Sequence, residues 1–440
     1  MKNGPYGRDR GRTPNGRPPE GDGRGREIEH VASGVPRQFL VLLTRPHVAG
    51  AAWWSVVSRL PVYLMSLAMV LVVREQGGSY AQAGFVAALY TLGMAVGSPL
   101  VARRVDRQGR RAVLLVTGVV YPAALALLVW ATRPGDWAQP VAAVAAGIAL
   151  PPANAVMRSL WARLPLRDEE RETAYLWEAL LTEVLVIGAP LMLAGLMLFG
   201  SAGTAVVTVA AMGGAGALGL ALTPLPSGVP ERGPADADGA GRPWLGPMRT
   251  PAMAVLTAVM ATCAVPVGLL TLAIPAFVDQ YGSTGGTGVV YACWGVGSAL
   301  GALLLGRSKS EVAVHRRFPW LVLAFALGAG LPLLATSPLT LGVALAVGGL
   351  PIALVSASEM TLVSQVADGR LLAEAFTWAS LATVVGDALG QQAGGLLVEA
   401  IGPRGVFAVA LATALAGAVL AFGCQTLLGR KATETAERTA

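Results

Sequence analysis

The 440-residue chain is 54% hydrophobic and only 13% charged, whereas an ordinary soluble domain is about 25% charged. This composition excludes a typical water-soluble protein and leaves room for about a dozen membrane spans of about 20 apolar residues each. The three cysteines lie far apart in apolar segments, so neither a disulfide framework nor a zinc or other metal site is predicted.

Residues 1–47 are rich in Arg, Gly and Pro. Such a segment has too little apolar surface to offset the entropy of ordering, so we predict a disordered basic tail in the cytoplasm. An RNA-binding arginine-glycine segment is the alternative, but the arginines are not interleaved with aromatic residues. No nucleic-acid partner and no secretory signal are predicted.

Twelve apolar stretches follow, each long enough to cross a bilayer. Their ranges are 48–73, 80–102, 112–132, 137–160, 174–198, 203–222, 252–278, 285–306, 319–336, 339–363, 372–398 and 404–428. Lipid allows only helices or closed barrels, and these stretches lack the alternation of barrel strands. The predicted fold is therefore an all-α integral membrane protein with twelve transmembrane helices.

Lys and Arg fall in every second loop. Of the 33 basic residues, 29 lie in the two tails and in the loops at 103–111, 158–171, 223–250, 307–317 and 364–373. The intervening loops hold only Arg74, Arg133 and Arg404. By the positive-inside rule, this asymmetry predicts a multi-pass protein of the inner, cytoplasmic membrane with both termini in the cytoplasm. The net charge of +7 is then a topology signal.

The chain also repeats itself. A shift of about 204 positions pairs Gly84 with Gly288 and Gly97 with Gly301, and a shift of about 201 pairs Trp177 with Trp378. We therefore predict two six-helix repeats, residues 48–222 and 252–428. A cytoplasmic linker, 223–251, joins them, and a cytoplasmic tail, 429–440, follows. Two facing bundles are the plan of a rocking transporter with its substrate site between the halves.

The loop after the second span reads ARRVDRQGRR from residue 102. It resembles the signature loop of the major facilitator superfamily, except that Ala102 replaces the leading glycine. The resemblance implies the family fold and a gating loop formed by Asp106, Arg107, Gly109, Arg110 and Arg111. In the family the Asp is thought to meet the N-terminus of helix 11, where the helix dipole favours an anion. Gly109 permits the positive φ of a tight turn in this loop. The alternative is a simple positive-inside turn, which would explain the arginines but not the Asp and Gly at fixed places among them.

The fifth span carries Gly188-Ala189-Pro190. It resembles a weakened form of the glycine-rich motif found in helix 5 of the family's antiporters, and so favours export. The eleventh span has a cleaner pattern, Gly386, Gly390 and Gly394. Ordinary close packing of helices is the alternative explanation for both patterns.

Ionisable residues deep in spans are candidates for proton coupling, because their burial is expensive. Arg59, Glu183 and Asp387 lie deepest. Arg59 and Glu183 are at similar depth, so a structural ion pair between them is the alternative to a role in coupling. Asp387 has no basic residue at comparable depth in its half, which favours a protonation role. Glu178 and Glu359 lie nearer the helix ends and are weaker candidates.

Aromatic and polar residues on the spans predict a substrate cavity suited to an organic molecule. Its expected lining is Trp54, Tyr90, Asn154, Tyr291, Trp294 and Ser358.

The chain has neither a phosphate-binding loop for ATP nor a Ser/His/Asp set. We therefore expect no enzyme activity and no cofactor, and transport driven by a gradient. The predicted function is proton-coupled export of a small drug-like or secondary metabolite by a monomer in the lipid bilayer. A proton-coupled importer of a small nutrient is one alternative, and a non-transporting receptor or scaffold with the same fold is another.

Overall fold

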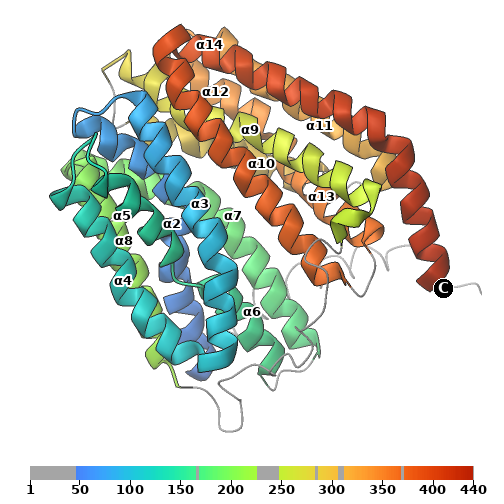
Figure 1. The fold of residues 1–440 in the computed structure, drawn as a ribbon, viewed down its shortest axis with the longest axis horizontal. Coiled ribbons are helices and arrows are strands. Elements are labelled where there is room, and N and C mark those ends of the chain that lie inside the picture. The colour runs from blue at the N-terminus through green and yellow to red at the C-terminus, as the bar shows by residue number, and fades with distance from the viewer. Residues whose placement is uncertain are drawn as a thin grey trace, which may run out of the picture.

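The computed structural model describes residues 46–164, 168–224, 247–282, 286–305, 312–367 and 371–439, which form helices and connections without a β-strand. Residues 1–45 of the predicted tail and most of the predicted linker 223–251 lie outside these residues, and α2 begins at Pro46, two residues before the predicted first span. Two groups of helices stand side by side, one blue to green and the other yellow to red (Figure 1). The fold is that of two six-helix repeats.

The first half contains seven helices within the described residues. They are α2 (Pro46–Glu75), α3 (Tyr80–Gln108), α4 (Arg110–Ala131), α5 (Ala138–Ile148), α6 (Ala153–Arg163), α7 (Asp168–Phe199) and α8 (Ala202–Leu222). The second half contains η1 (Pro247–Arg249), α9 (Pro251–Asp279), α10 (Thr287–Leu305), α11 (Val314–Gly330), η3 (Leu331–Leu334), α12 (Pro338–Gly349), α13 (Ile352–Val366) and α14 (Leu372–Thr439).

Eleven candidate membrane spans are present in the described part of the chain, and the last of them contains two predicted spans. This span, Glu374–Arg430, has 57 residues and would be about 85 Å long as one straight helix, against about 30 Å of hydrocarbon. Gly402 interrupts it with a φ of 72°, and Pro403 follows. The interruption supplies the turn between the eleventh and twelfth predicted spans. After them α14 continues to Thr439, into the predicted tail.

Two spans are each built from two shorter helices, which the sequence analysis did not foresee. α5 and α6 share the span Ala138–Trp161, and α12 and α13 share Pro338–Val366. Pro151 and Pro152 lie in the first break and Pro351 in the second. Proline has no N–H to donate and disfavours the helical conformation of the residue before it, so the backbone ladder stops there. As a result α6 and α13 begin inside candidate membrane spans.

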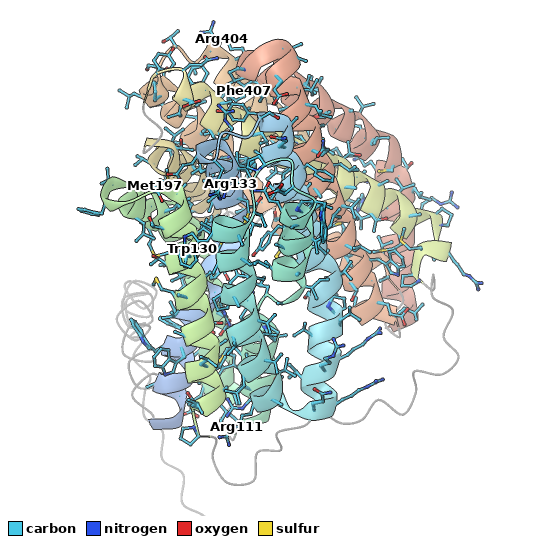
Figure 2. All side chains as sticks on the ribbon, turned by 60° about the vertical axis from the view of Figure 1, so that its left-hand side comes forward. Arg111, Trp130, Arg133, Met197, Arg404 and Phe407 are labelled. Atoms are coloured by element: carbon cyan, nitrogen blue, oxygen red, sulfur yellow. The ribbon has the colours of Figure 1, made fainter. Side chains whose placement is uncertain are left out.

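The two ends of the bundle differ in their arginine content. We call the end where α3 meets α4 the Arg-rich face, and the end where α2 meets α3 the Arg-poor face. Figure 2 shows Arg111 at the opposite end of the first half from Arg133 and Met197. This separation follows the alternation of basic loops in the sequence.

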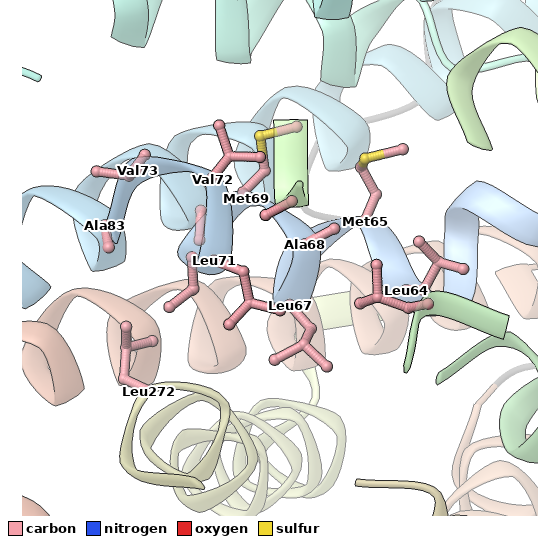
Figure 3. Close-up of a cluster of buried hydrophobic side chains, with 14 of the residues drawn as sticks. Leu64, Met65, Leu67, Ala68, Met69, Leu71, Val72, Val73, Ala83 and Leu272 are labelled. Atoms are coloured by element: carbon pink, nitrogen blue, oxygen red, sulfur yellow. The ribbon is translucent and has the colours of Figure 1, made fainter. Parts of the chain in front are cut away.

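The buried apolar side chains form three clusters, and their distribution differs between the two faces. Toward the Arg-poor face one cluster joins both halves: it contains Leu64 to Val73 of α2 together with Leu272 of α9 (Figure 3). Toward the Arg-rich face there are two clusters, one within the first half, around Trp161, and one within the second half, around Phe318. Among the described residues, the halves therefore share a buried apolar cluster only on the Arg-poor side.

Candidate functional site

The halves contact each other along two helix pairs, α3 with α14 and α7 with α10. We call these contacts the two seams, and the internal repeat relates one to the other. A Cβ at Gly84 of α3 would lie 2.5 Å from the carbonyl oxygen of Gln391 on α14, and one at Gly288 of α10 would meet the carbonyl oxygen of Pro190 on α7. Only glycine allows backbones to approach this closely. The Gly-Ala-Pro segment of the fifth span therefore lies at a seam between the halves.

The glycine pattern of the eleventh span serves a different contact. Gly386, Gly390 and Gly394 pack against Ala261, Val265 and Leu269 of α9, all within the second half. For these three residues, close packing within a bundle explains the pattern. Gly395, by contrast, faces the other half, where a Cβ would meet the carbonyl oxygen of Tyr80.

Polar contacts extend the α3–α14 seam to the Arg-poor face. The backbone N–H of Ala81, in the first turn of α3, donates to Oε1 of Glu399 at 2.9 Å. Tyr80 donates its hydroxyl to Oδ2 of Asp279 at 3.3 Å, and Arg74 lies 3.6 Å from the same oxygen. A carboxylate at a helix N-terminus is favoured by the helix dipole. These contacts close the Arg-poor end of the interface.

Asp387 lies at the inner end of this seam. Its Oδ2 accepts a hydrogen bond from Nε2 of Gln391 at 2.9 Å, and Oε1 of Gln391 accepts one from Thr91 of α3 at 3.3 Å. Gln391 is fully buried, whereas Oδ1 of Asp387 is buried without a hydrogen-bond partner. A candidate proton carrier is thus linked to the opposite half through one glutamine.

The structure corrects the predicted partner of Arg59. Its Nη1 pairs with Oε2 of Glu178 at 2.5 Å, and Oε1 of Glu178 accepts the indole N–H of Trp161 at 2.9 Å. Glu183 was expected in this place, but its side chain lies outside the described residues. Five residues turn a helix by about 140° and rise about 7.5 Å, so Glu178 and Glu183 cannot share one position.

A small pocket of about 130 Å³ adjoins Arg59. It lies between α2, α3 and the break that separates α5 from α6. Its polar side chains are those of Arg59, Ser98 and Asn154, and the remaining lining is mainly apolar. This is the place where the structure brings a predicted coupling residue and a predicted cavity residue together.

The other predicted cavity residues do not line this pocket. Trp54 packs against Gly219 of α8, and the hydroxyls of Tyr90 and Tyr121 lie 3.2 Å apart in the buried core of the first half. In the second half, Tyr291 is bonded to Thr271 at 3.0 Å and packs edge-on against Trp294. Ser358 is buried with an unpartnered hydroxyl. None of these five residues lines the pocket beside Arg59, and they are divided between the two bundles.

The loop between α3 and α4 is partly built as expected. Gly109 has a φ of 90°, which confirms the predicted positive φ. Arg110 is buried and donates to the carbonyl oxygens of Leu220 and Thr223 at 2.8 and 2.7 Å, so it caps the C-terminus of α8. Arg107 and Arg111 are exposed. The side chain of Asp106 lies outside the described residues, and its gating role stays a prediction.

Three residues that make the polar contacts described above were not predicted from the sequence as site residues. Glu178 ranked below Glu183, and neither Gln391 nor Glu399 was singled out. A signal existed for Gln391: it stands one turn after Asp387 in an apolar run, at the position that the 201-residue shift pairs with Pro190.

Comparisons with known proteins agree with this architecture. A family model described as Major Facilitator Superfamily matches residues 51–339, well over half of the chain. No curated protein is significantly similar in sequence.

Solved structures of transporters share the fold at low sequence identity. A mutant of the nucleoside transporter NupG has a TM-score of 0.69 and 13% identity, covering 86% of this chain and 99% of its own. A bacterial homologue of the human lysosomal transporter Spinster, in an inward-facing and occupied conformation, has a TM-score of 0.68 and 16% identity, covering 88% of this chain and 98% of its own. A mutant of the peptide transporter POT in complex with sulfate has a TM-score of 0.66 and 13% identity, covering 87% of this chain and 94% of its own.

Proposed function

Since the chain belongs to the major facilitator superfamily and is a membrane transporter, not an enzyme, we propose that it exports a drug-like or secondary metabolite in exchange for protons. The Arg-rich face is cytoplasmic and the Arg-poor face is external in this proposal. The transporter works as a monomer in the cytoplasmic membrane, on a small organic substrate.

The observation that carries the proposal is the uneven distribution of the buried core. One apolar cluster joins the halves toward the Arg-poor face, and two separate clusters lie toward the Arg-rich face. This arrangement suits a state that is closed to the outside and open to the cytoplasm. Alternating access then requires only that the seams at Gly84 and Gly288 open while the cytoplasmic ends come together.

Proton coupling is assigned to Asp387. Removal from water disfavours the charged form of a carboxyl group, and one carboxylate oxygen of Asp387 is buried without a partner. Its Gln391 partner contacts Thr91 in the other half. A change in the protonation of Asp387 therefore alters the contact between Gln391 and Thr91, which must break when the Arg-poor face opens.

Export rather than import is favoured by the seam at Pro190. The segment that resembles the antiporter motif, Gly188-Ala189-Pro190, contacts α10 of the other half at Gly288. A rigid small-residue contact there keeps the two conformations distinct, which an exchanger needs in order to avoid a leak.

Flux in proteoliposomes tests the proposal. The purified full chain is reconstituted with an imposed pH difference, and uptake of a panel of labelled compounds is measured in both directions of the gradient. We expect at least one compound to accumulate against its gradient as protons move the opposite way. Accumulation in the same direction as protons would favour a nutrient importer, and background flux for the whole panel would favour a receptor or scaffold.

A further inference from the structure

We propose that the pocket beside Arg59 binds the anionic group of an amphiphilic organic substrate, such as an aromatic carboxylate. This inference rests on the proposed transport function and adds a substrate class to it. Three independent features of the described residues point to an anion at this place.

The first feature is the unused hydrogen-bonding capacity of Arg59. The residue is 1% exposed, and the ion pair with Glu178 uses only Nη1. Nε and Nη2 are buried and have no hydrogen-bond partner. Buried donors of a guanidinium are costly to leave unpaired, and a carboxylate or phosphate oxygen is their best acceptor. Since Arg59 lines the pocket, a ligand there can supply that acceptor.

The second feature is the start of α6. This 11-residue helix begins inside the membrane with Pro152 as its N-cap, and no side chain caps it. Its first residues, Ala153, Asn154 and Ala155, line the same pocket. The N–H of Ala153 bonds to the carbonyl oxygen of Pro151, but the N–H groups of Asn154 and Ala155, in the first turn, have no intrahelical acceptor. These groups and the positive end of the helix dipole favour an anion at this position. A half-helix in a transporter serves anionic substrates in this way.

The third feature is the remaining lining. Besides Ser98 and the Asn154 amide, the pocket is bordered by apolar residues, among them Val62, Met94 and Leu150. Its volume of about 130 Å³ is far above the roughly 10–15 Å³ that one water needs. A compact charged head with an apolar body fits this combination better than an inorganic ion does.

The second half does not repeat the site. The position that the 204-residue shift pairs with Arg59 is Cys263, which is buried in the apolar cluster of that half. In the second half, the ionisable groups described deep in the spans are acidic: Glu359 is buried, and so is Oδ1 of Asp387. One anionic group per substrate, held by the first half, is therefore the arrangement that these residues favour.

Binding to the purified full chain tests the inference without transport. The probes are benzoate and its neutral isostere benzamide at equal ionic strength, and the readouts are the unfolding temperature and the Kd. We expect benzoate to bind and to raise the unfolding temperature, and benzamide to do neither. The variant with both Arg59→Gln and Glu178→Gln keeps no unpaired charge, and we expect it to bind benzoate roughly ten- to a hundredfold more weakly.

Two further variants sharpen this test. Glu178→Gln alone leaves Arg59 charged and should bind benzoate at least as tightly as the wild type. Arg133→Gln removes a cation from the Arg-poor face and should leave binding unchanged. Equal binding of benzamide, undiminished binding by the double variant, or the absence of benzoate binding in the wild type would each overturn the inference. If the protein fails this binding test but still accumulates other compounds against their gradients, the proposed transport function remains supported. Benzoate binding by a chain without flux would instead overturn the transport function alone.

Discussion

Arg59 is the residue on which the interior of the first half depends most. Its guanidinium is buried, neutralised by Glu178 and linked through that carboxylate to Trp161. The ion pair joins α2 to α7, and Arg59 also lines the pocket at the start of α6. A structural role and a binding role are therefore combined in one side chain.

The charge balance of this pair predicts the behaviour of variants. Arg59→Gln leaves Glu178 without its cation, and breaking a buried pair costs about 3–5 kcal/mol. We expect a clear loss of folded yield and a lower unfolding temperature, measured by size-exclusion chromatography and thermal unfolding in detergent. Adding Glu178→Gln should restore much of the loss, because no charge is then unpaired. A double variant no better than the single one would contradict the pairing.

Asp387 predicts a separation of exchange from coupling. Asp387→Asn keeps the size and the link to Gln391 but fixes a neutral state. In proteoliposomes we expect substrate exchange to persist and accumulation driven by a pH difference to disappear. Asp136→Asn, the same change on the Arg-poor surface, should accumulate substrate normally. If Asp387→Asn still concentrated substrate at the wild-type rate, the proton would have to travel by another group, such as Glu359 or Glu183.

At the scale of elements, the seam between α3 and α14 decides how firmly the Arg-poor face is closed. Gly84 has no room for a Cβ, while a Cβ at Gly423 of α14 would meet no other atom within 4 Å. The chain thus offers a matched pair of helical glycines, one at a seam and one in open space.

This pair gives a prediction for the closed state. Gly84→Leu should push α3 from α14, and overpacking of about 1–3 kcal/mol corresponds to roughly a tenfold or greater shift toward the open Arg-poor face. In a chain without native cysteines, Thr91→Cys should then react about tenfold faster with an impermeant thiol reagent in intact cells. Gly423→Leu should not change the rate. Equal rates in both variants would mean that the seam does not control access.

The loop between α3 and α4 predicts a gate at the other face. Asp106→Asn removes the charge expected at the N-terminus of the eleventh span while keeping its size. We expect normal membrane insertion and a strong reduction of transport, measured as flux per folded transporter. Flux at the wild-type level would reduce the loop to a topology signal, with Arg110 simply capping α8.

For the whole molecule, the sequence predicted the features that depend on composition and repetition. Apolar length located the spans, and alternate basic loops and the half-chain shift indicated an even number in two repeats. It did not predict features that depend on the direction of a side chain or on a break in the backbone. Depth alone paired Arg59 with Glu183 because it ignores helix rotation. Pro151 and Pro152 were the available signal for the start of α6, and the pocket depends on that break.

The central claim is that the two halves rock between two arrangements, closing one face as the other opens. Double electron–electron resonance measures this directly with spin labels on opposite halves, at Asp136→Cys with Arg404→Cys for the Arg-poor face and at Ala112→Cys with Arg316→Cys for the Arg-rich face. Between acidic and alkaline pH, we predict two distance populations at each face, with the short one growing at one face as it shrinks at the other. A single distance at each face, unchanged by pH and by Asp387→Asn, would contradict the account.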